Sequence, residues 1–350
     1  MLLLGVETSC DETSVAVIND RGEVLSNVIS SQIDRHQPFG GVVPEVASRE
    51  HLIHFGPVLE QSLRQAGVTL PEIGAIAVTS RPGLIGALLV GVAAAQGLSY
   101  GLGIPIVGVN HLEGHIYSPY LQKTGGAIGL PRRFLSLVVS GGHSSLYDVR
   151  SGDDRRIEML NRTRDDAAGE VFDKVAKFIG LPYPGGPHVE RVARGGDSSK
   201  IHFPLARFKD ESTDFSFSGL KAMAIRTARQ QQLITAPGDL VDERRLADFC
   251  AGFQGAIVDQ IEERITRIWN RLGDGDEPMP TELAIGGGVA ANTSLRERIA
   301  TWCADRNLTV RLPERTFCTD NGAMIAFAGL ERLRAGETDD PRRLIAQSRA

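Results

Sequence analysis

The chain has 350 residues, of which 42% are hydrophobic and 23% charged, which is typical of a globular protein with room for two domains. Its formal net charge is -5, so any contact with a nucleic acid would depend on a local basic patch or on a second subunit. Four cysteines without CxxC spacing argue against a zinc or disulfide framework and for a reducing cytoplasm, and no apolar run looks long and uninterrupted enough to span a bilayer.

The first predicted element is a strand–loop–strand–turn–strand unit. Residues 2–6 and 14–18 have strand-like composition, ETSCDET joins them, and Asp20-Arg21-Gly22 makes a turn into a third strand. The apolar start meets Glu7 at once and has no basic leader, so we expect a buried strand and not a signal peptide. A similar unit recurs at 134–150. This predicts two related lobes, although the spacing alone leaves duplication open.

An α/β stretch separates the two hairpin units. Residues 50–66 predict a helix, 74–80 a buried strand, 84–103 a helix rich in small residues, and 104–110 the next strand. Strands that alternate with helices predict a mainly parallel sheet with covered faces. The sequence therefore indicates the α/β class.

The second half of the chain combines helices, glycine-rich turns and one long loop. An amphipathic helix is predicted at 165–180, a loop at 182–220, a helix at 243–272, a strand at 282–290 and a helix after it. The last predicted helix begins at 322 and leads into a polar tail.

Two histidines, His111 and His115, lie four residues apart in VNHLEGH. At this spacing both lie on one helix face and can bind one metal ion, although one of them could instead be an ordinary core or surface histidine with its hydrogen bonds satisfied. A zinc peptidase needs glutamate directly after the first histidine, whereas Glu113 falls on the other side of the helix, so that interpretation fails. Asp320 is a candidate third ligand, but an Asp before an apolar helix can also be its cap, and spacing does not decide between the two.

Two glycine-rich turns follow predicted strands. The turn at 140–143, SGGH, can bring backbone N–H groups to an anionic ligand, although an ordinary hairpin turn is the simpler explanation. The run Gly286-Gly287-Gly288 lies between a strand and a helix, where a phosphate or nucleotide binds well, and Asn292 could cap that helix or contact the ligand. Neither turn is a Walker P-loop or a GxGxxG fingerprint. The polar stripe that contains Asp173 is also typical of a solvated helix face.

The order of the motifs points to one family. MLLLGVETSCDETSVAV, GGVVPEVASREH, RPGLIGALLVG, NHLEGH, SGGH, DDAAGEVFDKVAK, YPGGP, DFSFSGLK, IGGGVAAN and FCTDNGAMIA resemble, in this order, the bacterial form of the TsaD family of tRNA N6-adenosine threonylcarbamoyltransferases. The resemblance implies a two-lobed actin/Hsp70/sugar-kinase-like fold with a ligand cleft between the lobes. We expect an N-terminal lobe at 1–130, a C-terminal lobe at 131–321, and a helix at 322–345 that crosses back to the first.

The resemblance also implies site residues. His111, His115 and Asp320 would hold one metal ion, Fe²⁺ or alternatively Zn²⁺. Asp11, in the first hairpin, is our candidate for positioning the incoming base or accepting its proton, although a turn-forming Asp would look the same. The residues implied to bind the adenylate substrate are Val138, Val139, Ser140, Gly141, Gly142, Asp173, Gly186 and Asn292.

The implied reaction is an acyl transfer. Threonylcarbamoyl-AMP gives its threonylcarbamoyl group to N6 of the adenosine 3′ of the anticodon, in tRNAs that read codons beginning with A, and AMP leaves. The implied partners are tRNA, the paralogue TsaB and the small ATPase TsaE, in the cytoplasm and without a membrane. Arginines could contact tRNA phosphates or merely aid solubility; they lie at 132, 133, 332, 334, 342, 343 and 349.

One departure from the family pattern and three rival functions stay open. Arg81 stands where a small residue is expected and could contact a phosphate or simply be exposed. The rivals are a kinase or ATPase of the same fold, a metallopeptidase, and a non-catalytic scaffold such as the TsaB paralogue. The first two would hydrolyse ATP or peptides without tRNA, and the third should lack the metal residues.

Overall fold

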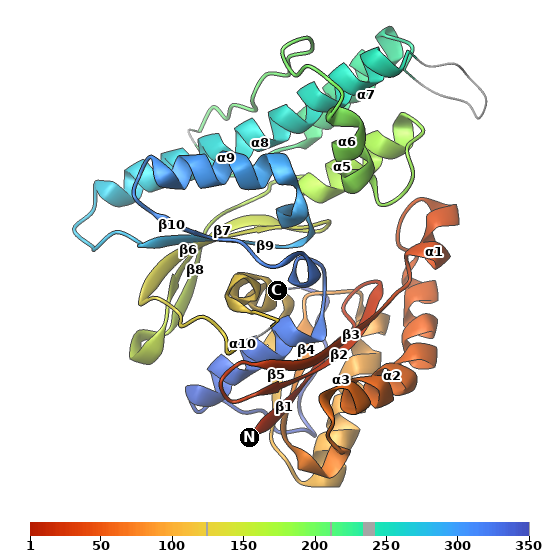
Figure 1. The fold of residues 1–350 in the computed structure, drawn as a ribbon, viewed down its shortest axis with the longest axis vertical. Helices are drawn as coiled ribbons and strands as arrows, with labels where there is room; N and C mark the ends of the chain where they lie inside the picture. Colours follow the sequence, from red (N-terminus) through yellow and green to blue (C-terminus); the bar gives the residue numbers. More distant parts are fainter. Residues whose placement is uncertain (124, 211, 234–241, 350) are drawn as a thin grey trace. The chain divides into compact units, whose positions relative to one another are not determined.

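The computed structural model describes residues 1–123, 125–210, 212–233 and 242–349 (Figure 1). The chain divides into two compact units: unit 1 is Met1–Leu130 with Pro313–Ala350, and unit 2 is Pro131–Leu312. Residues 313–321, expected in the C-terminal lobe, thus belong to unit 1. This assignment brings Asp320 into the same unit as His111 and His115.

Unit 1 is built on a five-stranded mixed sheet with the strand order β3-β2-β1-β4-β5. The three strands of the N-terminal hairpins pair antiparallel, whereas β4 runs parallel to β1 and β5 runs parallel to β4. The parallel pairing predicted from the α/β stretch is confirmed for β4 and β5, but the sheet as a whole is mixed, because the hairpins contribute an antiparallel half. The strands are β1 (Leu2–Glu7), β2 (Glu12–Asn19), β3 (Val24–Ser31), β4 (Ile73–Arg81) and β5 (Ile106–Asn110).

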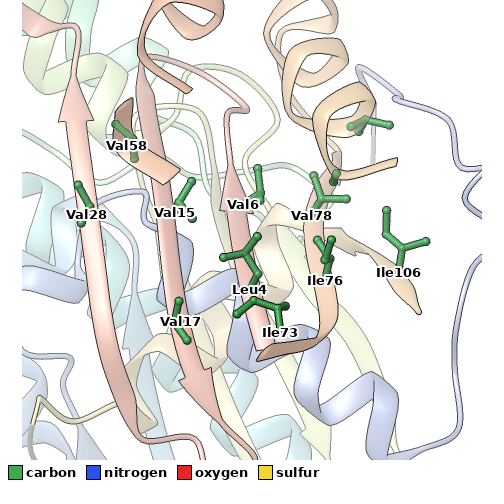
Figure 2. Packing of buried hydrophobic residues seen from close by; sticks show 12 residues of the cluster. Leu4, Val6, Val15, Val17, Val28, Val58, Ile73, Ile76, Val78 and Ile106 are labelled. Carbon is green, nitrogen blue, oxygen red and sulfur yellow. The ribbon is translucent and has the colours of Figure 1, made fainter. Parts of the chain in front are cut away.

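Helices cover both faces of this sheet. Leu4 and Val6 of β1 lie two residues apart and therefore point to the same face, where they pack in a cluster with Val58 of α2 (Figure 2). Val92 of α3 belongs to the same cluster. The other face receives α10, which approaches closely because Gly5 has no side chain. The helices are α1 (Ile33–His36), α2 (Pro44–Ala66), α3 (Ile85–Leu102), α4 (His111–Tyr117) and α10 (Gly322–Arg334).

The close approach of α10 depends on two facing glycines. A Cβ atom on Gly5 would lie 2.1 Å from the backbone oxygen of Gly322, and one on Gly322 would lie 2.7 Å from the backbone nitrogen of Ala16. Both distances are shorter than any real carbon contact, so only glycine fits. The start of α10, two residues after Asp320, is thereby held against the middle of the sheet.

The expected helix at 322–345 ends at Arg334. The segment beyond it returns to the sheet of unit 1, where Asp339 forms an antiparallel bridge with Ile106 of β5. Further on, the backbone N–H of Gln347 donates to the carbonyl oxygen of Ser80 over 2.8 Å. The tail thus covers the edge strand and reaches the carboxyl end of β4.

Helix α3 also corrects an expectation about membranes. By length and composition, Ile85–Leu102 is apolar enough to cross a bilayer, contrary to the prediction that no such run exists. The same test is passed by helices that pack in the core of a protein. Buried residues such as Leu88 and Val92 of α3 pack in unit 1, so the helix has a role in the core.

Unit 2 repeats the topology of unit 1 strand for strand. Its order is β10-β9-β6-β7-β8, with an antiparallel hairpin half and with β9 and β10 added in parallel. This correspondence supports the expectation of two related lobes. The strands are β6 (Arg133–Val139), β7 (Ser144–Arg150), β8 (Arg156–Arg162), β9 (Glu282–Gly286) and β10 (Thr309–Arg311).

The helices of unit 2 confirm the predicted amphipathic helix and include two helices, at 185–193 and 218–230, that the sequence analysis missed. Val171, Phe172 and Val175 form the buried face of α5, as predicted. Helix α6 lies in the segment expected to be a loop, because its glycine-rich start is a weak helix former and packing against α5 and α8 stabilises it instead. The helices are α5 (Ala168–Phe178), α6 (Gly185–Ala193), α7 (Ser218–Gln230), α8 (Glu243–Gly273) and α9 (Thr293–Ala304).

The carboxylate of Asp165 accepts hydrogen bonds from the residues at the start of α7. It accepts hydrogen bonds from the backbone N–H of Phe217 over 2.8 Å and from the hydroxyl of Ser218 over 2.7 Å. Burial opposes the charged form, but these and further hydrogen bonds outweigh it and lower the pKa of Asp165. The stabilisation is thus present at neutral pH and is lost as the pH falls below about 3.9, the ordinary Asp value, and through the lowered folded pKa.

Asp165→Ala is expected to lower the free energy of unfolding by about 1–2 kcal/mol at neutral pH, a modest figure because water screens the exposed side of the carboxylate. Urea unfolding of the variant and the wild type measures this difference at pH 7 and at successively lower pH. The difference should shrink in acid, and Asp153→Ala, at an exposed acid in unit 2, should be neutral throughout. An equal difference at every pH would contradict the assignment.

Candidate metal centre

The two histidines are placed by the junction of β5 and α4. Asn110 ends β5 and caps α4, accepting a hydrogen bond from the backbone N–H of Leu112 over 2.9 Å. His111 is therefore the first residue of α4, at the carboxyl end of a parallel strand, and His115 lies one turn further on. Both side chains are buried, and their ring centroids are 4.7 Å apart.

Asp320 joins the two histidines from the other end of unit 1. The cap of α10 is Asn321, whose Oδ1 accepts from the backbone N–H of Met324, so the alternative that Asp320 caps this helix is wrong. Asp320 Oδ1 lies 3.1 Å from Nε2 of His115 and 3.5 Å from Nε2 of His111. One ligand atom from each of the three residues lies within 4.8 Å of the others.

The geometry of these three residues fits a metal ion. Among the described residues, neither buried ring nitrogen of His115 has a hydrogen-bond partner, although Asp320 lies so near. Donors bound to one ion at about 2.0–2.1 Å would lie roughly 3.0–3.4 Å apart, close to the separations from Asp320. Two imidazoles and one carboxylate are a common set for Zn²⁺ and for Fe²⁺. The group therefore has the donors, the spacing and the unsatisfied nitrogens of a metal site.

Glu7 supports His111 from behind and was missed by the sequence analysis. It ends β1, is fully buried, and places Oε2 3.0 Å from Nδ1 of His111. The same carboxylate accepts from the hydroxyl of Thr79 over 2.6 Å and from the backbone N–H of Ser9. A carboxylate on Nδ1 fixes the ring tautomer and leaves Nε2 for a metal. An acid that closes an otherwise apolar strand was the signal available in the sequence.

The charges around the histidines favour a cation. Burial opposes protonation of His111, but Asp320 and Glu7 outweigh it and raise the pKa of His111 to about 9. Burial also disfavours the charged form of Glu7, which by itself would raise the pKa of its carboxyl, but the neighbouring His111 holds that pKa below the ordinary value. Burial lowers the pKa of His115, which keeps that ring in the neutral form that binds metals. The carboxylates that attract a proton to His111 would attract a metal ion equally.

Asp11 lies in the loop between β1 and β2, close to this centre. It is buried, and its carbonyl oxygen accepts from the backbone N–H of Gln32 over 2.9 Å. Burial, followed by the charges of Asp11 and Asp320, raises the pKa values of Cys10 and Glu12. The loop thus carries negative potential beside Asp320. Cys10 and Glu12 are further neighbours that the sequence analysis did not single out.

A buried histidine holds this loop in place. Nδ1 of His51 accepts from the side-chain amide of Gln32 over 3.3 Å and lies 2.7 Å from the hydroxyl of Thr13. Its Nε2 therefore carries the proton and donates to the carbonyl oxygen of Cys10 over 3.0 Å. Burial lowers the pKa of His51, consistent with a neutral ring.

The first five residues predicted to bind the adenylate lie where β6 ends. Val138 and Val139 are buried, and the turn after them exposes Gly141 and Gly142. The carbonyl oxygen of Ser140 accepts from the backbone N–H of Gly169 over 3.1 Å, which holds the start of α5 against the turn. A Cβ on Gly287 would lie 2.3 Å from the carbonyl oxygen of Val139, so the turn after β9 packs here as well.

The other three predicted residues lie on the helices of unit 2. Asp173 of α5 accepts from the backbone N–H of Gly185 over 2.6 Å. At the start of α6, a Cβ on Gly186 would meet nothing within 4 Å. Asn292 caps α9, accepting from the backbone N–H of Leu295, and donates to Gln254 over 2.8 Å. The capping role of Asn292 is thus confirmed, and the ligand roles of all eight residues stay predictions.

Glu7→Gln is expected to weaken metal retention by about 10–100-fold, because the amide binds the His111 ring more weakly and no longer fixes its tautomer. Competition with a chelator, followed by metal analysis, measures the change. Glu60→Gln, at an exposed acid of α2, is the matched control and should leave retention unaltered. Equal retention in both variants would remove Glu7 from the centre.

The chain matches known proteins over most of its length. A family model described as TsaD, tRNA N6-adenosine threonylcarbamoyltransferase, matches residues 23–327. The protein of that name from Sorangium cellulosum (strain So ce56) is 46% identical over 346 residues, covering 97% of this chain and 94% of that protein. Its counterpart from Desulfitobacterium hafniense (strain Y51) is 48% identical over 331 residues, covering 94% and 92%.

Solved structures share the fold at low identity. Full-length HypF in its phosphate- and nucleotide-bound form gives a TM-score of 0.58 at 12% identity, covering 96% of this chain and 46% of HypF. Component A of (R)-2-hydroxyglutaryl-CoA dehydratase from Acidaminococcus fermentans gives 0.51 at 12% identity, covering 96% and 99%. These matches concern the fold alone, and they confirm the α/β class of the actin/Hsp70/sugar-kinase-like proteins.

The arrangement of the candidate metal ligands and the match to the TsaD family model point to the same family. The histidine pair and the acid before α10 converge as the resemblance implied, and the family match spans both segments. The chain is therefore a transferase that belongs to the TsaD family, the tRNA N6-adenosine threonylcarbamoyltransferases.

Proposed function

We propose that this chain transfers the threonylcarbamoyl group of threonylcarbamoyl-AMP to N6 of the adenosine 3′ of the anticodon, in tRNAs that read codons beginning with A. The observation that carries the proposal is the buried group of His111, His115 and Asp320 with Glu7 behind it. A kinase or ATPase of the same fold has no need of such a group, and a scaffold paralogue should lack it. Peptidase chemistry is disfavoured because Glu113 follows His111 by two residues instead of one, which places it on the other side of the helix from the two histidines.

The proposed step exchanges one bond for another. N6 of adenine bonds to the carbamoyl carbon, the bond from that carbon to the phosphate oxygen breaks, and AMP leaves while N6 loses one proton. An ion bound by the three ligands would supply Lewis acidity to a substrate oxygen. Of the chain's own residues, Glu7 orients His111, and Asp11 positions the base or accepts the proton.

We propose Fe²⁺ as the resident ion, with Zn²⁺ as the alternative. Two histidines and one carboxylate with further positions open are the donor set of many non-haem iron sites, although zinc accepts the same ligands. The open positions would accommodate substrate oxygens. Elemental analysis of protein purified without added metal distinguishes the two ions.

The proposed adenylate site is the glycine-rich end of the sheet in unit 2. Support comes from the exposed glycines of the turn at 140–142 and from the open space above Gly186. Exposed backbone N–H groups suit phosphate oxygens, and Asp173 suits ribose hydroxyls. The residues proposed are Val138, Val139, Ser140, Gly141, Gly142, Asp173, Gly186 and Asn292.

Asp11→Asn is expected to lower the transfer rate by roughly 10²–10⁴-fold if the carboxylate accepts the proton of N6. The substitution keeps the size of the side chain, so metal content and AMP binding should stay at wild-type levels. Single-turnover transfer to tRNA measures the rate. A near-normal rate in a folded, metal-loaded variant would remove Asp11 from the chemistry.

An apolar groove in unit 1 is the proposed docking place of the TsaB paralogue. Its volume is about 360 Å³, and it lies between α2 and α3, with Leu52 69% exposed and Leu89 53% exposed. Exposed apolar surface of this kind marks an interaction site. We further propose that TsaE and tRNA join the assembly and that the chain works in the cytoplasm without a membrane.

The basic residues considered for tRNA contacts divide into two groups. Arg133 pairs with Asp148, and Arg332 pairs with Glu337, so both serve the fold. Arg132, Arg334, Arg342, Arg343 and Arg349 are exposed and stay candidates for phosphate contacts, although Arg334 pairs with Glu331, and Arg342 and Arg343 pair with Asp340.

Transfer of labelled threonine and bicarbonate to tRNA, in the presence of the partner proteins, tests the proposed function. We expect label on tRNA that depends on this chain and is lost on treatment with a chelator. ATP hydrolysis without tRNA would favour the kinase rival, peptide hydrolysis the peptidase, and absence of both metal and transfer the scaffold.

A further inference from the structure

Arg81 is a partly buried arginine without a partner. It ends β4, and among the residues that the structure describes its guanidinium makes no hydrogen bond or ion pair. Every other partly buried arginine in the described ranges has a partner group, for example Arg133 with Asp148 and Arg311 with Glu282. Taking a guanidinium out of water costs free energy unless an anion or acceptor compensates it. The guanidinium of Arg81 is therefore left, among the described residues, without the internal anion or acceptor that the other partly buried arginines have.

Arg81 lies next to the metal centre, at the carboxyl end of its strand. Strands β4 and β5 are parallel, and Arg81 lies opposite Asn110, the residue before His111. The turn after Arg81 is tied to the same centre, because Leu84 donates through its backbone N–H to Ser9, whose hydroxyl lies 3.2 Å from His111. Ligands of open α/β sheets bind beyond the carboxyl ends of parallel strands.

Other groups at this end of β4 add positive charge. Helix α3 begins four residues after Arg81, and its N-cap Leu84 offers no side-chain acceptor to the first N–H groups. The tail reaches the same strand end through the bond from Gln347 to Ser80, two residues before Arg349. No described acid lies within ion-pair distance of Arg81.

We propose that Arg81 binds a phosphate oxyanion of a substrate beside the metal centre. A guanidinium offers a planar fork of donors that matches two phosphate oxygens, and it stays charged at any relevant pH. The proposal rests on the proposed function in one respect, because that function supplies two sources of phosphate. One is the phosphodiester backbone of tRNA, and the other is the phosphate of the adenylate.

The test compares Arg81→Gln with Arg81→Lys and with Arg64→Gln in the full chain. Arg64 is an exposed arginine of α2 without an ion pair in the described structure, so its substitution removes the same charge elsewhere. Binding of unmodified tRNA is measured over a range of salt concentrations, and binding of AMP by calorimetry. Thermal unfolding establishes that each variant is folded, and Arg81→Gln should unfold like the wild type because no internal bond is lost.

Arg81→Gln is expected to weaken the binding of tRNA or of AMP by about 10-fold or more. Arg81→Lys should have an intermediate affinity, and Arg64→Gln should bind like the wild type. If tRNA is affected, the slope of log affinity against log salt should fall by about one, and the source is the phosphodiester. If AMP alone is affected, the source is the adenylate. Unchanged binding in both arms, or an equal loss in Arg64→Gln, would overturn the proposal.

The result is separable from the proposed function. A wild-type chain that binds tRNA and AMP but transfers no threonylcarbamoyl group contradicts the proposed reaction while leaving the role of Arg81 intact. A wild-type chain that transfers the group, with an Arg81→Gln variant equal in both binding arms, contradicts only the role of Arg81.

Discussion

His115→Ala is expected to abolish stable metal binding and to lower transfer to tRNA at least about 100-fold, since even residues behind the ligands of metal sites contribute 10–100-fold. The reason is that His115 supplies one of only three converging donors in the described chain, and its nitrogens have no other bonds there. Metal content of the purified variant, and transfer with metal added back, measure the two effects. Asp320→Asn should behave similarly, because an amide is a weaker ligand than a carboxylate.

His54→Ala is the matched control for this experiment. His54 lies on α2 and is partly exposed, and among the described residues Glu50 is its hydrogen-bond and ion-pair partner, so its removal should change neither metal content nor transfer. Thermal unfolding of all variants separates loss of metal from loss of fold. A folded His115→Ala protein that retains about one ion per chain would refute the assignment of the ligands.

Gly5→Ala is expected to destabilise unit 1 by about 1–3 kcal/mol or more and to impair metal retention in the folded fraction. The added methyl group would lie 2.1 Å from the backbone oxygen of Gly322, so α10 must move away from β1. Asp320 lies two residues before Gly322, and it would move with the helix. Urea unfolding gives the stability, and metal analysis under native conditions gives the retention.

Gly97→Ala is the matched substitution for Gly5→Ala. Gly97 lies in α3, where an added Cβ would meet nothing within 4 Å, so alanine should stabilise the helix by up to about 1 kcal/mol. If both variants were equally stable, the close packing of α10 would not be what positions Asp320.

Much of the fold could be predicted because its elements have strong local signals. The two hairpin units alternate apolar residues around polar turns, and α2, α3 and α8 have long helical patterns, so all were found from the sequence. The sheet type was not, because local patterns do not show that a hairpin continues into a parallel sheet. Helix α6 was missed because Gly185 and Gly186 are typical of turns and its stability depends on tertiary packing.

The metal site was only partly predictable, for a related reason. The spacing of His111 and His115 within one helix is visible in the sequence, but the choice of Asp320 over a capping role came from the resemblance. Glu7 and Thr79 meet His111 only because β1, β4 and β5 are neighbours in the sheet. Strand order is a property of the folded chain, so no spacing rule connects them with His111, although an acid at the end of an apolar strand marks Glu7 itself.

The ligands of the metal centre bracket all of unit 2 in the sequence, since His111 and His115 precede it and Asp320 follows it. An ion held there would clasp α4 to α10 and close one very long chain loop, in the way that a cross-link restricts an unfolded polymer. The melting temperature of unit 1 should therefore rise with the concentration of free metal ion. Scarcity of the metal would shorten the lifetime of the folded protein as well as lower its transfer rate.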